Sequence, residues 1–229
     1  MAPEFAAGSE GQSYSVKRCG NNGPPPSGRQ GLMMSEPGSW PPSAAPSGRG
    51  GRPGPERAGP EAVWTIALDT LARASNVAAA ASAERELQAQ TASALAGPFA
   101  DWVFVDLFGC DPARAVAATR PDAVLARALT QVALGACPLI RSAVRRRTPL
   151  VQASVRDPSL LGTLPGGEPV ITALGAHSVA VGPIISRGAV AGAIAIARCA
   201  RSPLVSFLEL GVLARIADLT GVAAARLAS

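Results

Sequence analysis

The sequence predicts an α+β fold, with an antiparallel sheet, flanking helices and a disordered N-terminal tail. Two pairs of β-rich runs, each joined by a short turn, predict hairpins and therefore antiparallel strands. Helical spacing of apolar residues before, between and after these pairs predicts helices that are segregated from the strands. The 229 residues are enough to bury one sizeable core. We therefore expect a tail over residues 1–59 and one domain over 60–229.

Composition separates the tail from the domain. Residues 1–60 hold 12 of the 24 Gly and 11 of the 21 Pro, including Pro24–Pro26. Their apolar side chains are too sparse to offset the entropy lost on ordering, so we expect disorder. Six basic and four acidic residues leave this segment with a charge of +2, which favours a solvated linker over an RNA-binding arm.

The domain is expected to begin with two helices. Pro60 suits the first turn of a helix that runs to about Ala80, with apolar residues at helical spacing along one face. Ser82 is expected to cap a second helix. The stripe of that helix consists of Leu87, Thr91 and Leu95, and it ends before Gly97-Pro98.

A first hairpin follows. Residues 101–108 alternate, with Trp102, Phe104 and Asp106 on one face and Val103, Val105 and Leu107 on the other, which predicts a strand. A turn over 109–112 leads to a weaker strand over 113–118. Further along, residues 122–134 and 139–147 predict helices, the first with Val124, Leu125, Leu129 and Val132 inward, and residues 150–155 predict a short strand.

The clearest local signal is a second hairpin. The β-rich runs 178–185 and 190–197 are joined by residues 186–189, where Gly188 can take the positive φ of a tight turn. Gly182 and Gly192 lie inside these strands and predict bulges or a close backbone approach. A long helix is expected from Pro203 to Ala228.

Three stretches of this pattern resemble GAF domains of bacterial regulators. Residues 100–107 (ADWVFVDL) resemble the first strand of the family. Residues 175–185 (GAHSVAVGPII) resemble its G-x-x-S segment followed by an apolar strand, and residues 187–196 (RGAVAGAIAI) resemble its hairpin return. The similarity spans about 85–229. It is greatest to GAF domains that precede sporulation-type serine/threonine phosphatases, histidine kinases or RNA-binding antiterminator modules.

The resemblance implies a non-catalytic regulatory domain that binds a small ligand, a partner protein, or both. The expected partner is a signalling output protein, such as a phosphatase, kinase or regulator. Because the sequence stops at Ser229, we expect this output either in a separate protein or in a domain from which this one has been cut loose. Residues 118–122 (ATRPD) lack the His of the H-x-D-P segment found in phosphatase-type relatives, so a role for that His does not transfer. The alternatives are a ligand-free dimerisation or scaffold domain and, more remotely, a GAF-fold redox enzyme.

The resemblance also implies a pocket between the sheet and the helices over it. The expected ligand-binding residues are Trp102, Phe104, Asp106, Arg120, Arg141, His177 and Ser178, with Val151 and Val181 nearby. Asp106 would be costly to bury alone, so we expect it to face water or to make a structural pair; if it lies in the ligand site instead, Arg120 or Arg141 is the candidate partner. The sequence assigns no cofactor.

Residue types argue against catalysis and metal binding. His177 is the single His, and the four Cys form no C-x-x-C pair, so we expect no metal site and no catalytic triad. The Gly-rich segment 162–167 lacks the Lys and Ser/Thr of a phosphate loop. Arg145–Arg147 is a potential anion site, but at a helix C-terminus it more simply complements the helix dipole. Cys137 lacks the adjacent His of bilin-binding relatives.

Other features concern location and assembly. The sequence contains neither a signal peptide nor an apolar run long enough to cross a membrane, so a cytoplasmic protein is expected. Aromatic residues make up only 4%, which argues against nucleic-acid stacking. A homodimer through the terminal helices is expected, because Val205, Val212 and Leu227 would be exposed in a monomer. The alternative is that the N-terminal helix covers them within one chain.

Overall fold

The computed structural model describes residues 60–97, 99–109, 114–120, 122–200 and 202–229. The expected tail, residues 1–59, and most of the first hairpin turn lie outside these ranges. In chain order the elements are α1 (Pro60–Ala80), α2 (Glu84–Leu95), β1 (Trp102–Leu107), β2 (Arg114–Ala118), α3 (Ala123–Thr130), the 3₁₀ helix η1 (Leu134–Ala136), α4 (Pro138–Arg146), β3 (Leu150–Gln152), the 3₁₀ helix η2 (Pro158–Leu161), α5 (Val170–Leu174), β4 (Ala176–Ser186), β5 (Ala189–Cys199) and α6 (Phe207–Leu227).

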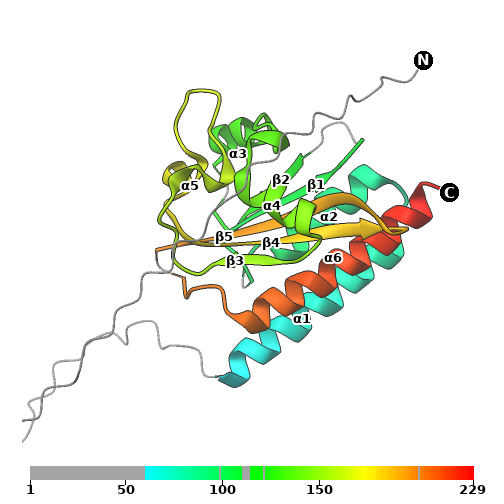
Figure 1. Cartoon of the computed structure of the whole chain (residues 1–229). Coiled ribbons are helices and arrows are strands. Elements are labelled where there is room, and N and C mark those ends of the chain that lie inside the picture. Colours follow the sequence, from blue (N-terminus) through cyan, green and yellow to red (C-terminus); the bar gives the residue numbers. More distant parts are fainter. Residues whose placement is uncertain (1–59, 98, 110–113, 121, 201) are drawn as a thin grey trace, which may run out of the picture. The chain divides into compact units, whose positions relative to one another are not determined.

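The five strands form one antiparallel sheet in the order β2-β1-β5-β4-β3. Helices α1, α2 and α6 cover one face, and α3, α4 and α5 cover the other (Figure 1). The predicted α+β architecture is therefore confirmed. None of the helices within the described ranges is both long and apolar enough to cross a membrane.

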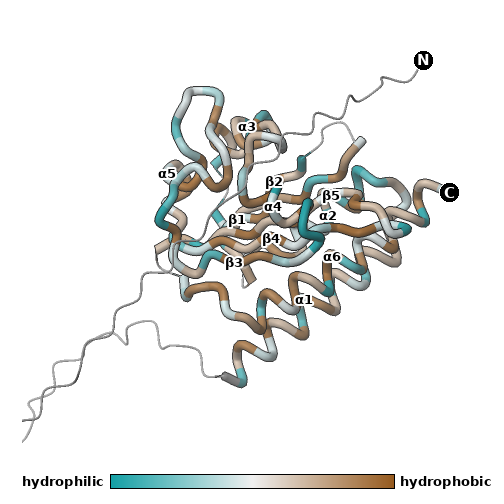
Figure 2. The backbone as a smooth tube through the Cα atoms, viewed as in Figure 1, coloured by the Kyte–Doolittle hydropathy of each residue, from teal (hydrophilic) through white to brown (hydrophobic). Residues whose placement is uncertain are grey.

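Strand β1 separates two apolar cores. Its alternation places Val103, Val105 and Leu107 in the core under α1, α2 and α6, and places Trp102 and Phe104 in the core on the opposite face. All six residues of the strand are buried, so both faces of the sheet are covered at this point. The hydropathy colouring accordingly shows brown, apolar strands in the centre of the domain (Figure 2).

The β4–β5 hairpin closes as the sequence predicts. Its two-residue turn consists of Arg187, with φ of 49°, and Gly188, with φ of 79°; this combination matches the twist of the flanking strands. Gly192 of β5 allows a close backbone approach, because a Cβ atom there would lie 1.9 Å from the carbonyl oxygen of Asp106. The predicted role of Gly192 is thus confirmed.

Several predicted boundaries are wrong. Ser82 does not cap α2; the N-cap is Ala83, and Ser82 instead donates both its N–H and its hydroxyl to the carboxylate of Glu86. The strand predicted over 150–155 ends at Gln152, and the helix predicted over 122–134 ends at Thr130. Val124 points outward and is 81% exposed, because the α3 helix buries only one short face.

The C-terminal helix begins later than predicted. Ser206, not a residue near Pro203, is the N-cap: its hydroxyl accepts from Glu209 N–H, and the Glu209 carboxylate accepts from Ser206 N–H. The segment before the cap is extended, and Val205 in it is buried rather than exposed. Val212 and Leu227 also pack partly against the core of the α1 face. The expected exposure of these three residues in a monomer is therefore wrong.

Candidate functional site

A cleft lies at the end of the sheet where β1 begins and where β2 and β5 end. The register sets this location, because Trp102 pairs with Ala118 of β2 and with Ala197 of β5. The cleft has a volume of about 470 Å³, within the range typical of small-molecule sites. It is lined by Asp101, Trp102, Thr119, Arg120, Leu174, Gly175, Cys199, Ala200 and Ser202.

One wall of the cleft comes from the end of α5. This five-residue helix stops because Gly175 adopts a left-handed conformation, with φ of 61°, and its N–H donates to the carbonyl of Thr172. Leu174 supplies an apolar surface, and its carbonyl accepts from the thiol of Cys199 at 3.1 Å. The sequence analysis did not predict α5, which is too short to give a helical period.

The charged residues of the cleft differ in their contacts: Asp101 is hydrogen-bonded within the fold, whereas Arg120 forms no ion pair with a described residue. Asp101 Oδ2 accepts from the Cys199 N–H at 2.8 Å, and the Asp101 carbonyl accepts from the Thr119 N–H at 2.9 Å. Asp101 therefore ties three strand ends together. Arg120 is exposed, and its side chain forms no ion pair with any residue in the described ranges. A guanidinium beside an aromatic wall suits a ligand with a flat apolar part and an anionic group.

The thiol in the cleft is held in its neutral form. Burial raises the pKa of Cys199, and the carboxylate of Asp101 raises it further. The thiolate is the nucleophilic form of cysteine, so this side chain is a poor nucleophile at neutral pH. Among the described residues, no three His, Cys, Asp or Glu side chains lie close enough together to hold a metal ion.

Asp106 is engaged in a buried ion pair. Its two carboxylate oxygens accept from Nε and Nη2 of Arg114, at 2.7 and 3.1 Å, and neither residue is more than 3% exposed. Burial raises the pKa of Asp106, and Arg114 opposes that effect. The candidate partners Arg120 and Arg141 do not pair with Asp106, because the β1–β2 register places Arg114 directly opposite. The expected structural pair is what forms.

The remaining predicted site residues are dispersed. Phe104 is buried under the Arg114 guanidinium, 5.4 Å from its ring centre. Arg141 is exposed on α4, and Ser178 faces the α6 side of the sheet, where its hydroxyl accepts from Val205 N–H at 3.0 Å. His177 is half-buried, and its Nδ1 has no partner within the described part of the chain. Of the seven predicted residues, only Trp102 and Arg120 line the cleft.

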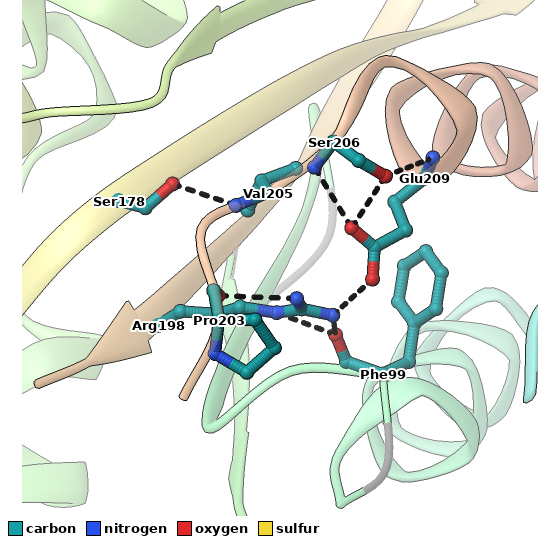
Figure 3. Close-up of polar contacts among 7 residues, drawn as sticks. All are labelled: Phe99, Ser178, Arg198, Pro203, Val205, Ser206 and Glu209. Carbon is teal, nitrogen blue, oxygen red and sulfur yellow. Dashed lines mark hydrogen bonds and ion pairs between the residues drawn. The ribbon is translucent and has the colours of Figure 1, made fainter. Parts of the chain in front are cut away.

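A polar cluster links the wall of the cleft to α6 (Figure 3). Arg198 donates to the carbonyls of Phe99 and Pro203 and to the carboxylate of Glu209, and all of these groups converge at the start of α6. Sequence reasoning missed this cluster. The S-x-x-E pattern at 206–209 was a usable signal, because a capping box marks the helix start and buries a carboxylate that needs a cation.

No protein-family model matches the chain, and no curated protein does. Several solved structures, in contrast, have a similar fold. The GAF domain of an Acinetobacter phosphoenolpyruvate-protein phosphotransferase is 17% identical, with a TM-score of 0.53, over 69% of this chain and 92% of that chain. A free methionine-R-sulfoxide reductase from Neisseria meningitidis, solved with its substrate, is 18% identical, with a TM-score of 0.53, over 72% and 93%.

A third solved structure, the nlh2 GAF domain of A. aeolicus, is 14% identical, with a TM-score of 0.51, over 73% of this chain and 99% of that chain. These similarities show that the fold is GAF-like, as the sequence resemblance implied. Regulatory domains and a reductase share this fold. The fold alone therefore does not separate a sensor from an enzyme.

Proposed function

We propose that this chain is a non-catalytic sensory domain of bacterial signal transduction that acts in the cytoplasm. It binds a small anionic molecule in the cleft beside Trp102 and Arg120, and it communicates with a signalling output protein. The observation that carries the proposal is the cleft itself, which combines an aromatic wall with a guanidinium that forms no ion pair with any described residue. An arginine fork recognises carboxylate or phosphate groups, and the apolar wall contributes by burial.

Native mass spectrometry tests this proposal. The purified protein, sprayed first under gentle and then under denaturing conditions, is expected to release a small molecule. The variant Arg120→Ala should lose it, because the exposed guanidinium is free to bind the ligand and makes no ion pair with any described residue of the fold. Arg85→Ala, at an exposed position of α2, is the matched control and should retain it. If both variants retain the molecule equally, Arg120 does not take part in binding it. If the wild type releases no molecule, that result counts against the sensory function.

The redox enzyme is less well supported. Of the four Cys, only Cys137 and Cys199 fall within the described ranges, and burial raises the pKa of both thiols. Cys137 donates to the carbonyl of Leu161 at 3.1 Å and lies beside Arg114. Both thiols are therefore poorly suited to attack a sulfoxide. An assay with methionine sulfoxide and a thiol reductant should give no turnover, and activity that is lost in Cys199→Ser would reverse this assignment.

The second part of the proposed function is that the chain forms a homodimer. The alternative function, a ligand-free dimerisation or scaffold domain, would require the same dimer. Helices α1 and α6 lie side by side and run in the same direction (Figure 1). Their C-terminal ends meet, where Arg226 of α6 donates to the carbonyls of Ala79 and Ala81. At the opposite end of this helix pair, large apolar side chains face solvent: Trp64, Leu68, Leu204 and Phe207. A second copy that covers them across a two-fold axis would bury both sets.

A further inference from the structure

Helix α4 and its C-cap residue, Arg147, carry four arginines that the cleft does not use. The inner face of α4 buries Leu139, Ile140 and Ala143, while Arg141, Arg145, Arg146 and Arg147 are exposed. The side chains of Arg145, Arg146 and Arg147 make no ion pair or hydrogen bond with any residue in the described ranges. Arg141 makes a single long hydrogen bond, of 3.4 Å, to the carbonyl of Gly135. The cluster is thus a concentrated and unneutralised positive charge.

Two carboxylates of nearby segments cap helices other than α4. Asp122 Oδ1 accepts from the N–H groups of Val124 and Leu125 and caps α3. Asp157 Oδ1 accepts from the N–H and hydroxyl of Ser159 and caps η2. The helix dipole favours cations in the last turn of α4, but it does not account for Arg141, which lies one turn earlier. Like charges at positions 141 and 145 repel each other, and an external anion would remove that cost.

A groove lies directly beside these arginines. It has a volume of about 230 Å³ and runs between α4 and β3, lined by Pro138, Leu139, Ser142, Arg146, Leu150, Val151, Gln152 and Leu160. Arg146 lies in the groove. Arg145, three residues after Ser142, lies on the adjoining side of the helix at 100° per residue. Strand β3 is an edge of the described sheet, with β4 on one side and no described strand on the other.

We infer that this surface docks an extended, acidic segment of a partner protein. The segment adds to the edge of β3, where main-chain groups can pair, and it presents carboxylates to Arg145 and Arg146. The chain's own residues 1–59 do not suit this role, because they carry six basic and only four acidic residues. The groove lining includes no aromatic residue on which a nucleic-acid base could stack, which favours a peptide.

Fluorescence anisotropy with a defined probe tests the inference. The probe is a fluorescein-labelled ten-residue peptide of alternating Glu and Val, titrated with the full chain at low salt. Binding is expected, and R145E/R146E should weaken it about tenfold or more. The matched control R85E/R215E changes the net charge equally on the opposite layer and should leave the affinity unchanged. No binding by the wild type, or an equal loss in both variants, would overturn the inference.

Two further probes examine the docking mode on the unaltered protein. The same peptide with alternate backbone nitrogens methylated keeps its charge but cannot pair as a strand, so it should bind about tenfold more weakly. Equal affinity would contradict docking at the β3 edge. A single-stranded RNA of ten uridines should bind more weakly than the peptide. Tighter binding of the RNA would contradict the inference and indicate that the partner is a nucleic acid. The groove shares no lining residue with the cleft, so these results are independent of ligand binding there.

Discussion

Arg198, in β5, forms a buried ion pair with Glu209, in the first turn of α6 (Figure 3). The other oxygen of the Glu209 carboxylate accepts from Ser206 N–H and Oγ, both at 2.8 Å. The remaining donors of Arg198 go to the carbonyls of Phe99 and Pro203. One guanidinium therefore holds together the start of β1, the connection after β5 and the start of the C-terminal helix.

Removal of Arg198 should destabilise the domain strongly. Arg198→Ala leaves the buried carboxylate of Glu209 without a cation and removes the donor to the buried carbonyl of Phe99, so the free energy of unfolding should fall by about 3–5 kcal/mol. The control is Arg215→Ala, which breaks an exposed pair with Asp218 and should cost less than about 1 kcal/mol. Urea denaturation followed by circular dichroism measures both. A loss for Arg198→Ala as small as that of the control would contradict the prediction.

Two glycines of α6 should respond in opposite directions to the same substitution. Gly221→Ala would place Cβ 2.0 Å from the carbonyl oxygen of Ile185, so β4 and α6 must move apart, at a cost of about 3 kcal/mol. A Cβ at Gly211 meets nothing within 4 Å, and Gly211→Ala should stabilise the helix by about 0.5–1 kcal/mol. Thermal unfolding midpoints provide the comparison. A stable Gly221→Ala protein would show that the helix–strand contact is looser than described.

The pH dependence of stability should reveal the contact at the start of α2. Hydrogen bonds from the N–H and then the hydroxyl of Ser82 lower the pKa of Glu86 below its usual 4.5. Because the folded pKa lies below the unfolded one, the stabilisation is present above pH 4.5 and is lost as the pH falls through the folded value. Glu86→Gln should therefore lower the thermal unfolding midpoint at pH 7. At a pH below the folded pKa of Glu86, the same substitution should leave the midpoint unchanged.

A titration by NMR of the Glu86 carboxyl carbon provides the direct measurement. Ser82→Ala removes the hydroxyl and keeps the N–H, so it should raise the pKa of Glu86 part of the way back to its usual value. Ser93→Ala, an exposed Ser at the other end of α2, is the control and should leave the pKa unchanged. An unaltered pKa in Ser82→Ala would mean that the hydroxyl does not act on this carboxylate.

The fold was predictable from sequence wherever one local pattern dominated. The alternation of residues 102–107 predicts a strand, and the sequence Arg187–Gly188 predicts a tight turn between two strands. Both signals are local in the sequence, and both features are observed. Even the partner of Asp106 could have been predicted. The predicted hairpin places residues of its second strand opposite those of the first, and the β1–β2 register pairs Asp106 with Arg114.

The cleft was less predictable because distant segments build it. Leu174 ends a five-residue helix, Cys199 ends β5 and Arg120 follows β2, and no short-range period brings these residues together. Arg198 illustrates the same difficulty: it is one of 15 basic residues in the domain, and only the packing of α6 on the sheet reveals that it is buried. Resemblance to a family supplied a set of site residues, of which two reach the cleft.

The N-terminal tail should be dispensable for folding. A chain that begins at residue 58 keeps all of α1 and should match the full chain in its thermal unfolding midpoint, because the sparse apolar residues of 1–57 offer little surface to bury. A chain that begins at residue 72 is the control: it loses buried Ala67 and Thr70 and should unfold at a lower temperature. Limited proteolysis gives a second readout, with a protected core that begins near residue 58. A protected fragment that retains Pro24–Pro26 would contradict the prediction.

The exposed apolar residues at the start of the α1–α6 pair should mediate dimerisation. Leu68 is 61% and Phe207 is 85% exposed, and burial of side chains of this kind contributes roughly 1.5–3 kcal/mol each. Light scattering at micromolar concentration should give twice the chain mass. Leu68→Glu with Phe207→Glu should give the chain mass alone, because each places a charge in a dry contact. Val212, which the sequence suggested for the interface, is unsuitable for this test, since it is partly buried and a charge there would disturb the fold. Val124→Glu, at an 81% exposed site on α3, controls for the loss of any exposed apolar residue and should leave the dimer intact. A wild type with the mass of one chain would refute the dimer and leave Trp64, Leu68 and Phe207 as a surface for a different protein.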